Sequence, residues 1–176
     1  MRYLFLTLTA YLMACLTLSA CQQTNTNPKS YEGRDGNFTA ILMPIDVKDV
    51  VEFDKPSNQG PKLVLKNQAI VGDKVALKIV FMGMELTKDM QGDVSYDLVV
   101  LAPDGSIYPG TDIKNISALE GKVSTPHNVF NSPATMVLNF EPEDQIGTYK
   151  VTTTVKDNIG KRQVLLEHDI ELQKAQ

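Results

Sequence analysis

The sequence contains few residues of the kinds that most often perform covalent or metal chemistry. Of its 176 residues, two are Cys, two are His and none is Trp. Both cysteines, Cys15 and Cys21, lie close to the N-terminus, so the chain beyond them can form neither a disulfide nor a cysteine metal site. The patterns His-Glu-x-x-His, Gly-x-Ser-x-Gly and Ser-x-x-Lys are all absent. We therefore expect no enzymatic activity, no bound cofactor and no metal centre.

The chain also lacks a basic segment. It has 17 Lys and Arg against 21 Asp and Glu, a formal net charge of −4, and the two signs are interspersed. Proteins that bind nucleic acid or anionic lipid by charge concentrate lysine and arginine on one face or in one segment. The composition therefore argues against a nucleic-acid partner and against electrostatic attachment to a membrane.

The N-terminus has a long uncharged run. Met1-Arg2 is followed by an uncharged, largely apolar stretch from Tyr3 to Leu18, and then by the small pair Ser19-Ala20. A positive start, an apolar segment and small residues at the end are the parts of a secretory signal peptide. An uncleaved transmembrane helix is the alternative, but spanning a bilayer takes about 20 apolar residues, and this run is near the lower limit.

The end of this run, Leu18-Ser19-Ala20-Cys21, resembles the lipobox of bacterial lipoproteins. The resemblance implies that residues 1–20 are a signal peptide that is removed and that Cys21 is lipidated with palmitate and related acyl chains. Two or more acyl chains are enough for stable membrane attachment. In lipoproteins of Gram-negative bacteria an Asp after the cysteine favours the inner membrane. Gln22 stands there in this chain, which implies the outer membrane, on its periplasmic side.

Composition divides the rest of the chain into two parts. Residues 21–37 begin with Cys21 and continue with Gln, Thr, Asn, Pro, Gly and charged residues, with almost no apolar side chains. Such a segment cannot bury enough surface to offset its ordering entropy, so we expect a flexible tether. Residues 38–174 contain no second linker and no repeat, and they have the usual length of one domain.

Alternation of apolar and polar residues predicts that this domain is all-β. In Thr148–Lys156, the residues Tyr149, Val151, Thr153 and Val155 share one face, as in an antiparallel strand with one buried side. The other expected strands are residues 38–43, 62–65, 74–81, 94–101, 134–140 and 163–172, and residues 46–53 are equally consistent with a loop and with a helix capped by Asp46. Seven or eight strands with frequent turns indicate a β-sandwich or a barrel.

The segment from Glu143 to Tyr149 is similar to the tyrosine corner of immunoglobulin-like domains, although one extra residue separates Asp144 from Gly147. Together with Tyr96-Asp97-Leu98 and Pro103-Asp104-Gly105, it makes residues 72–172 resemble uncharacterised bacterial envelope proteins that have one immunoglobulin-like domain. The resemblance implies a single immunoglobulin-like antiparallel β-sandwich of seven to eight strands. It implies no activity.

Two methionines are the candidate contact site for a protein partner. Met82 and Met84 follow the expected strand at residues 74–81, where an exposed methionine pair would form an adaptable contact surface. His168 falls on the apolar face of the last strand, and His127 falls in a loop. The leading hypothesis is a lipid-anchored envelope protein that binds or supports another envelope protein.

The alternative is a periplasmic lipoprotein that binds a small ligand, a carbohydrate or a metal ion. Tyr31 and Tyr108 are the candidate aromatic residues for a carbohydrate. Thioether sulfur is a ligand for Cu(I) and carboxylate oxygen is a ligand for Ca²⁺. The residues considered for copper are Met82, Met84 and Met90, and those considered for calcium are Glu141, Glu143, Asp144, Asp157 and Asn158.

Overall fold

The computed structural model describes residues 31–55, 62–124 and 129–174. Over these ranges the chain is mostly β, as alternation predicts, and forms ten strands and one short 3₁₀ helix. The elements are β1 (Glu32–Asp35), β2 (Phe38–Asp46), η1 (Val47–Asp54), β3 (Gln68–Ile70), β4 (Lys74–Met82), β5 (Gln91–Leu101), β6 (Ile113–Lys122), β7 (Phe130–Asn131), β8 (Met136–Asn139), β9 (Gly147–Asp157) and β10 (Arg162–Gln173).

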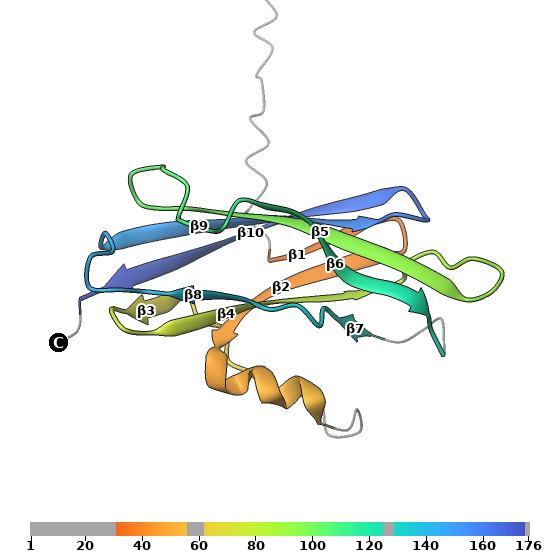
Figure 1. The fold of residues 1–176 in the computed structure, drawn as a ribbon, viewed down its shortest axis with the longest axis horizontal. Helices are drawn as coiled ribbons and strands as arrows, with labels where there is room; N and C mark the ends of the chain where they lie inside the picture. Colours follow the sequence, from red (N-terminus) through yellow and green to blue (C-terminus); the bar gives the residue numbers. More distant parts are fainter. Residues whose placement is uncertain (1–30, 56–61, 125–128, 175–176) are drawn as a thin grey trace, which may run out of the picture.

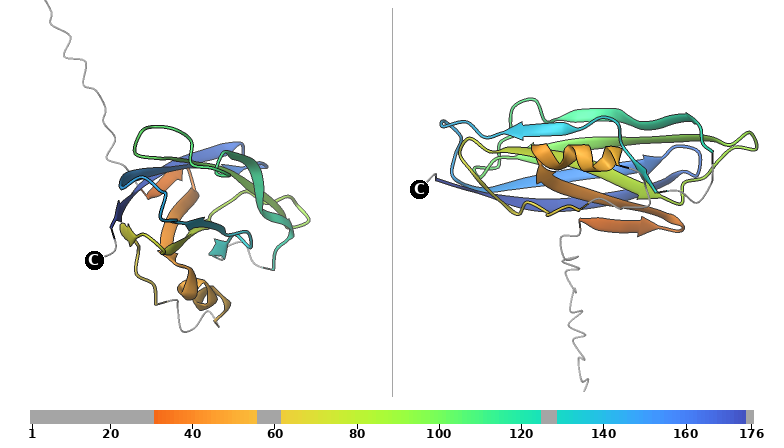
Figure 2. Two further views of the ribbon diagram at one scale, coloured as in Figure 1. Left: turned by 60° about the vertical axis from the view of Figure 1, so that its left-hand side comes forward. Right: turned by 90° about the horizontal axis from the view of Figure 1, so that it is seen from below.

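The strands form two five-stranded sheets that lie one over the other (Figure 1). The first sheet has the order β1-β2-β4-β7, and β8 also pairs with β4; the second has the order β3-β10-β9-β5-β6. The named strands pair in antiparallel fashion, apart from the short parallel pair of β10 with β3. Figure 2 shows that η1 lies across the outer side of the first sheet.

The expectation of seven to eight strands is wrong, because the described residues contain ten. Strand β6 has no clear period-two pattern because its pairing with β5 shifts register twice, and Asn115 has a positive φ of 53°. Residues 62–65 do not form a strand, and β3 lies further along the chain. Strand β1 lies within residues 21–37, the expected tether. Its four residues are almost entirely polar, and backbone pairing with β2 holds them in place.

The ambiguous segment after β2 is helical. Asp46 is the N-cap of η1, and its Oδ1 accepts a hydrogen bond from the Lys48 N–H at 3.1 Å, which satisfies one of the free donors at a helix start. No helix among the described residues is both long and apolar enough to cross a bilayer.

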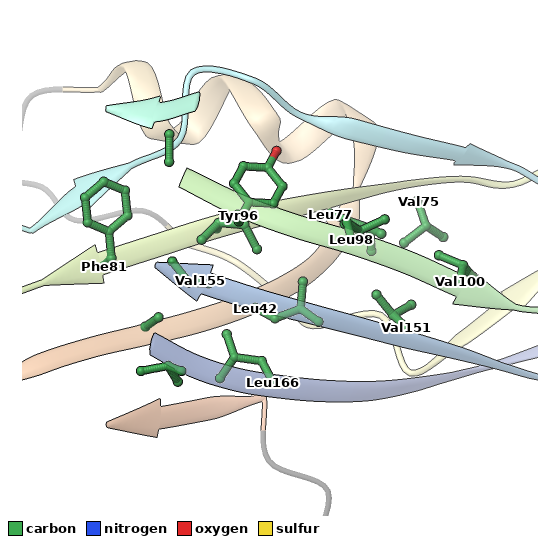
Figure 3. Close-up of a cluster of buried hydrophobic side chains, with 14 of the residues drawn as sticks. Leu42, Val75, Leu77, Phe81, Tyr96, Leu98, Val100, Val151, Val155 and Leu166 are labelled. Carbon is green, nitrogen blue, oxygen red and sulfur yellow. The ribbon is translucent and has the colours of Figure 1, made fainter. Parts of the chain in front are cut away.

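One hydrophobic core lies between the two sheets (Figure 3). The inward side chains come from alternate positions of the long strands, so each strand buries one face. A fully buried side chain of this kind contributes about 1.5–3 kcal/mol relative to leaving it exposed. The labelled residues of the cluster are Leu42, Val75, Leu77, Phe81, Tyr96, Leu98, Val100, Val151, Val155 and Leu166.

Tyr149 fixes one end of the core. Its hydroxyl donates a hydrogen bond to the Gln145 carbonyl oxygen at 3.0 Å, the backbone contact that is typical of a tyrosine corner. Its ring lies edge-on to Phe140 at 5.0 Å and to Tyr108 at 5.4 Å between centroids, an arrangement that aromatic pairs prefer. The loop before β9 is therefore held to the core through one side chain.

Lys78 is a buried cation on the outer face of β4, beneath η1. It is 4% exposed. Its Nζ donates to the Ser132 carbonyl oxygen and to Thr135 Oγ1, and it lies 5.4 Å from the centroid of the Phe53 ring. Burial lowers the pKa of Lys78, and the nearby charge of Asp54 opposes this only in part. The ammonium group is hydrogen-bonded but forms no ion pair among the described residues.

We expect Lys78→Met to remove a pH-dependent part of the stability. Because the pKa of Lys78 is lower in the folded chain than its ordinary 10.5, the unfolded chain binds more protons as the pH approaches 10.5, and the free energy of unfolding gains a contribution that rises with pH. Urea unfolding of the wild type and the variant at pH 8 and pH 10 measures this contribution as the difference between the two proteins.

Lys74→Met is the matched control, because Lys74 is an exposed lysine of the same strand. Removing it should leave the difference between the two pH values as in the wild type. An unchanged pH dependence in Lys78→Met would contradict the burial of a charged ammonium group at this position.

Candidate functional site

A shallow pocket of about 480 Å³ lies at one edge of the second sheet. Its volume is in the range of small-molecule sites, which is roughly 300–1,000 Å³. The pocket combines one exposed aromatic ring, one amide, one hydroxyl, one imidazole and three carboxyl groups. The lining residues are Tyr31, Asn67, Thr148, Glu167, His168, Asp169 and Glu171.

The pocket forms where the edge of β10 lies between two neighbours. Strand β3 pairs with β10 only at residues 171–173. Strand β1 packs further back, where Gly33 lies against Val164 and Leu166 so closely that a Cβ would meet Val164 at 2.5 Å. Residues 167–169 of β10 lie between these two contacts and line the pocket together with Tyr31 and Asn67.

The backbone of β10 also presents polar groups to this edge. The Glu171 N–H donates to the Asn67 carbonyl oxygen at 2.9 Å, and the Gln163 N–H donates to Asp35 Oδ2 at 3.1 Å. In an antiparallel strand the N–H and C=O of one residue point to the same side of the strand, and those of the next residue point to the other side. The odd-numbered residues of β10 therefore turn their backbone groups toward the pocket edge, and Glu167 is one of them.

The three carboxyl groups come from a single strand. Glu167, Asp169 and Glu171 alternate with buried residues in β10 and therefore share its outer face. Thr148 of β9 donates its hydroxyl to Glu171 Oε2 at 2.6 Å. Within the described part of the chain, Glu167 and Glu171 form no ion pair, and the pocket lining contains neither Lys nor Arg.

His168 reaches the pocket from the inner face of the same strand. It is 8% exposed, as its place on the apolar face of the expected strand suggests, and its Nε2 has no hydrogen-bond partner among the described residues. Burial lowers the pKa of His168. The Lys66 backbone and the Asp169 charge act in the opposite direction and are weaker. The ring is therefore neutral at pH 7 and adds no positive charge to the pocket.

The structure separates the two methionines of the candidate contact site. Met82 is 37% exposed at the end of β4, whereas Met84 is 7% exposed and packs into the core. Gly83 redirects the chain between the two methionines. Its φ is 71°, and a Cβ at this position would lie 2.0 Å from the Asn37 carbonyl oxygen, so a larger residue would not fit. The two side chains therefore do not form an exposed pair. Contact of a partner with Met82 stays a prediction, and Cys21 and His127 lie outside the described residues.

The carboxylates considered for calcium have structural partners. Asp144 Oδ2 accepts hydrogen bonds from the Tyr108 hydroxyl at 2.8 Å and from the Glu141 N–H at 2.7 Å. Asp157 is buried, and its two oxygens accept from the N–H groups of Glu85 and Gly160, each at 2.9 Å. Among the described residues no three His, Cys, Asp or Glu side chains converge as a metal site.

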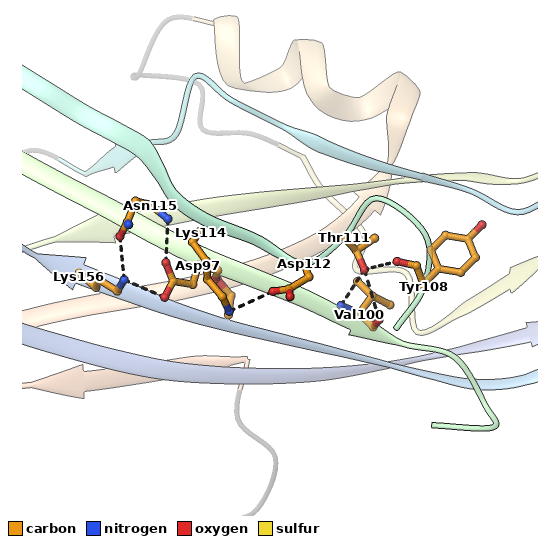
Figure 4. A network of polar contacts seen from close by, with 9 residues as sticks. Asp97, Val100, Tyr108, Thr111, Asp112, Lys114, Asn115 and Lys156 are labelled. Carbon is orange, nitrogen blue, oxygen red and sulfur yellow. Dashed lines mark hydrogen bonds and ion pairs between the residues drawn. The ribbon is translucent and has the colours of Figure 1, made fainter. Parts of the chain in front are cut away.

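A second polar cluster lies between β5, β6 and β9 (Figure 4). Asp97 pairs with Lys156 at 2.8 Å and accepts a hydrogen bond from the Asn115 N–H at 2.8 Å. Lys156 Nζ donates to Asn115 Oδ1 at 3.1 Å. Burial raises the pKa of Asp97, but the donors from Lys156 and Asn115 outweigh it and hold that pKa below its usual value. The cluster satisfies its own polar groups where the β5–β6 register shifts, so we assign it a structural role.

The sequence contained part of the pocket in a form that could be recognised. Acidic residues at alternate positions of the strand expected at 163–172 indicate a negative outer face. The alternation of apolar residues, by contrast, describes only the inner face of that strand. Tyr31 and Asn67 lie far from β10 in the sequence, and no pattern connects them to it. Their place in the pocket follows from the packing of β1 and β3 against β10.

No family model matches the sequence, and no curated protein matches it significantly. A family 123 glycoside hydrolase from Clostridium perfringens is 12% identical over 78% of this chain, with a TM-score of 0.45, and the chain spans 28% of that protein. The CARDB domain of a Pyrococcus furiosus protein, in complex with di-metal ions, is 14% identical, with coverages of 63% and 87% and a TM-score of 0.36.

An immunoglobulin-like protein from Pseudomonas aeruginosa is 15% identical over 83% of this chain and 99% of its own, with a TM-score of 0.34. These similarities assign no activity, ligand or partner to this chain.

We expect His168 to make stability depend on pH between about 5 and 7. Since its pKa is lower in the folded chain than the ordinary 6.5, the unfolded chain binds more protons below pH 6.5. The free energy of unfolding therefore falls as the pH is lowered through this range. His168→Gln should flatten the dependence, as measured by urea unfolding at pH 7.5 and pH 5.5.

His127→Gln serves as the comparison, since it removes the other histidine of the chain. Carboxylates with lowered pKa values, such as Asp46 and Asp73, lose their contribution at lower pH, near and below their ordinary values. A dependence that persists in His168→Gln and disappears in His127→Gln would show that the assignment to His168 is wrong.

Proposed function

We propose that this protein is a lipid-anchored bacterial envelope protein whose domain binds another envelope component and catalyses no reaction. The observation that carries the proposal is the sequence Leu18-Ser19-Ala20-Cys21 at the end of the apolar N-terminal run. Lipidation of Cys21 would attach the chain to the outer membrane, with the domain on the periplasmic side. The membrane and an envelope protein are then its partners.

The position of the pocket supports this arrangement. Tyr31 lines the pocket and lies ten residues after Cys21 in the sequence. Ten fully extended residues span at most about 33–36 Å. A lipid on Cys21 would therefore keep the pocket within that distance of the membrane surface, where an envelope partner or ligand is also confined.

We also propose that the domain is an immunoglobulin-like β-sandwich with additional short strands. Two sheets that enclose one core support this assignment, as does the hydrogen bond from Tyr149 to Gln145 before β9. The fold itself does not select a function, because sandwiches of this kind serve many unrelated roles.

A binding role is favoured over catalysis by the chemistry of the pocket. Its lining has no Ser, Cys or Lys, which are common nucleophiles of covalent catalysis. Binding of a small ligand is the second candidate function, and the pocket is the observation that favours it. Copper binding receives no support, because Met84 is buried in the core.

We expect cells that produce this protein to incorporate radiolabelled palmitate into it, and we expect Cys21→Ala to abolish the labelling completely. The acyl chains attach through the Cys21 sulfur and the amine that cleavage exposes, so the variant has no acceptor. The variant should also leave the membrane fraction, because each buried methylene contributes about 0.8 kcal/mol to membrane binding.

Cys15→Ala provides the control, since Cys15 lies in the segment that cleavage removes. Its labelling and its membrane association should equal those of the wild type. Wild-type protein extracted from membranes without lipid on Cys21 would refute the anchor.

A further inference from the structure

We propose that the pocket at the edge of β10 is a binding site for a single cationic group, an alkylammonium or a guanidinium. This inference deepens the proposed binding role and rests on it, but it does not depend on lipidation of Cys21. Three features of the described residues support it: the sign of the lining charge, the unpartnered nitrogen of His168, and the acceptors that surround the opening.

The charged side chains of the lining are all carboxylates. Glu167, Asp169 and Glu171 stand on one face of β10, and no lining residue is basic. Lys150 of β9 is opposite Asp169 in the ladder but lies outside the lining. Like charges on neighbouring positions of one strand repel each other. A bound cation would relieve this repulsion, whereas an anion would increase it.

His168 is the second, independent indication of a ligand. More than nine-tenths of the residue is buried, it lines the pocket, and its Nε2 has no hydrogen-bond partner within residues 31–55, 62–124 and 129–174. A buried polar atom without a hydrogen bond is unfavourable by about 1–3 kcal/mol, so native structures rarely retain one without a reason. A ligand N–H would supply the partner that this nitrogen lacks.

The remaining groups favour a nitrogen cation over a metal ion. The carboxylates and the imidazole come from opposite faces of β10, and no three potential metal ligands converge among the described residues. An alkylammonium or guanidinium group instead has several N–H donors that spread over separate acceptors. Tyr31 lines the pocket and is 46% exposed, and its aromatic ring is a surface on which such a cation packs well.

The cation has two conceivable sources that share this chemistry. One is external, a basic side chain of a partner or a free polyamine. The other is this chain itself, because Lys29 lies two residues before Tyr31 in the sequence. In the second case the pocket would hold the chain segment next to the domain, and an external cation would have to displace it.

The test is a titration of the purified full chain with pentane-1,5-diamine, followed by calorimetry and by the imidazole NMR signals. We expect saturable binding that weakens with salt and shifts the signals of His168 but not those of His127. The neutral analogue pentane-1,5-diol should not bind. The double variant Glu167→Gln, Glu171→Gln should bind at least about fivefold more weakly, since each partly exposed ion pair adds a modest amount.

The matched control is Glu120→Gln, Glu143→Gln, which removes the same charge from exposed positions elsewhere. Its affinity should change by less than about twofold, and circular dichroism should show that both double variants are folded. Lys29→Gln distinguishes the sources. Tighter binding in this variant identifies Lys29 as the resident cation, and unchanged binding identifies an external one; both outcomes support a cation site.

The inference is overturned if neither the wild type nor Lys29→Gln binds the diamine, or if the diol binds equally well. Equal weakening in the two double variants would also overturn it, because the effect would then reflect net charge alone. These outcomes are separate from the palmitate experiment. A protein that is labelled but does not bind the diamine retains the anchor and loses the cation site. A protein that binds the diamine but is not labelled retains the cation site and loses the anchor.

Discussion

The register of the β9–β10 hairpin is the constraint on which the rest of the structure depends. Eleven residue pairs join the two strands, and alternate residues of both point into the core. A slip of one residue would turn every buried side chain of a strand toward solvent. The same register that places Leu166 and Ile170 in the core places Glu167, Asp169 and Glu171 outside, so packing and pocket chemistry have one origin.

Several polar side chains are buried within this apolar framework, and each has a different environment. Asp157 accepts two backbone hydrogen bonds and Lys78 donates two, so the desolvation of these groups is offset by well-placed partners. His168 differs from both, because one of its ring nitrogens has no hydrogen-bond partner in the part of the chain that the structure describes. This contrast within one domain is the reason that the β10 edge, and neither of the other two sites, is the candidate for a ligand.

The pocket lies beside the first strand that follows the proposed anchor in the sequence. Strand β1 follows closely after Cys21 in the sequence, and it also forms one border of the pocket. A lipid on Cys21 would confine the pocket near the membrane surface, so that binding would occur at a high effective concentration of membrane components. The proposed location would therefore favour the proposed binding role.

The sequence alone determined the mostly β class and the long strands, because period-two burial is a local property, whereas it left residues 46–53 open between a loop and a helix capped by Asp46. It did not reveal β1, which is almost entirely polar, β6, whose pairing with β5 shifts register twice, or β7, which has only two residues. It also placed Met82 and Met84 together, whereas the turn at Gly83 sends Met84 into the core. Only the tertiary structure joined Tyr31 and Asn67 to β10, because that contact depends on how the two sheets pack at their edge.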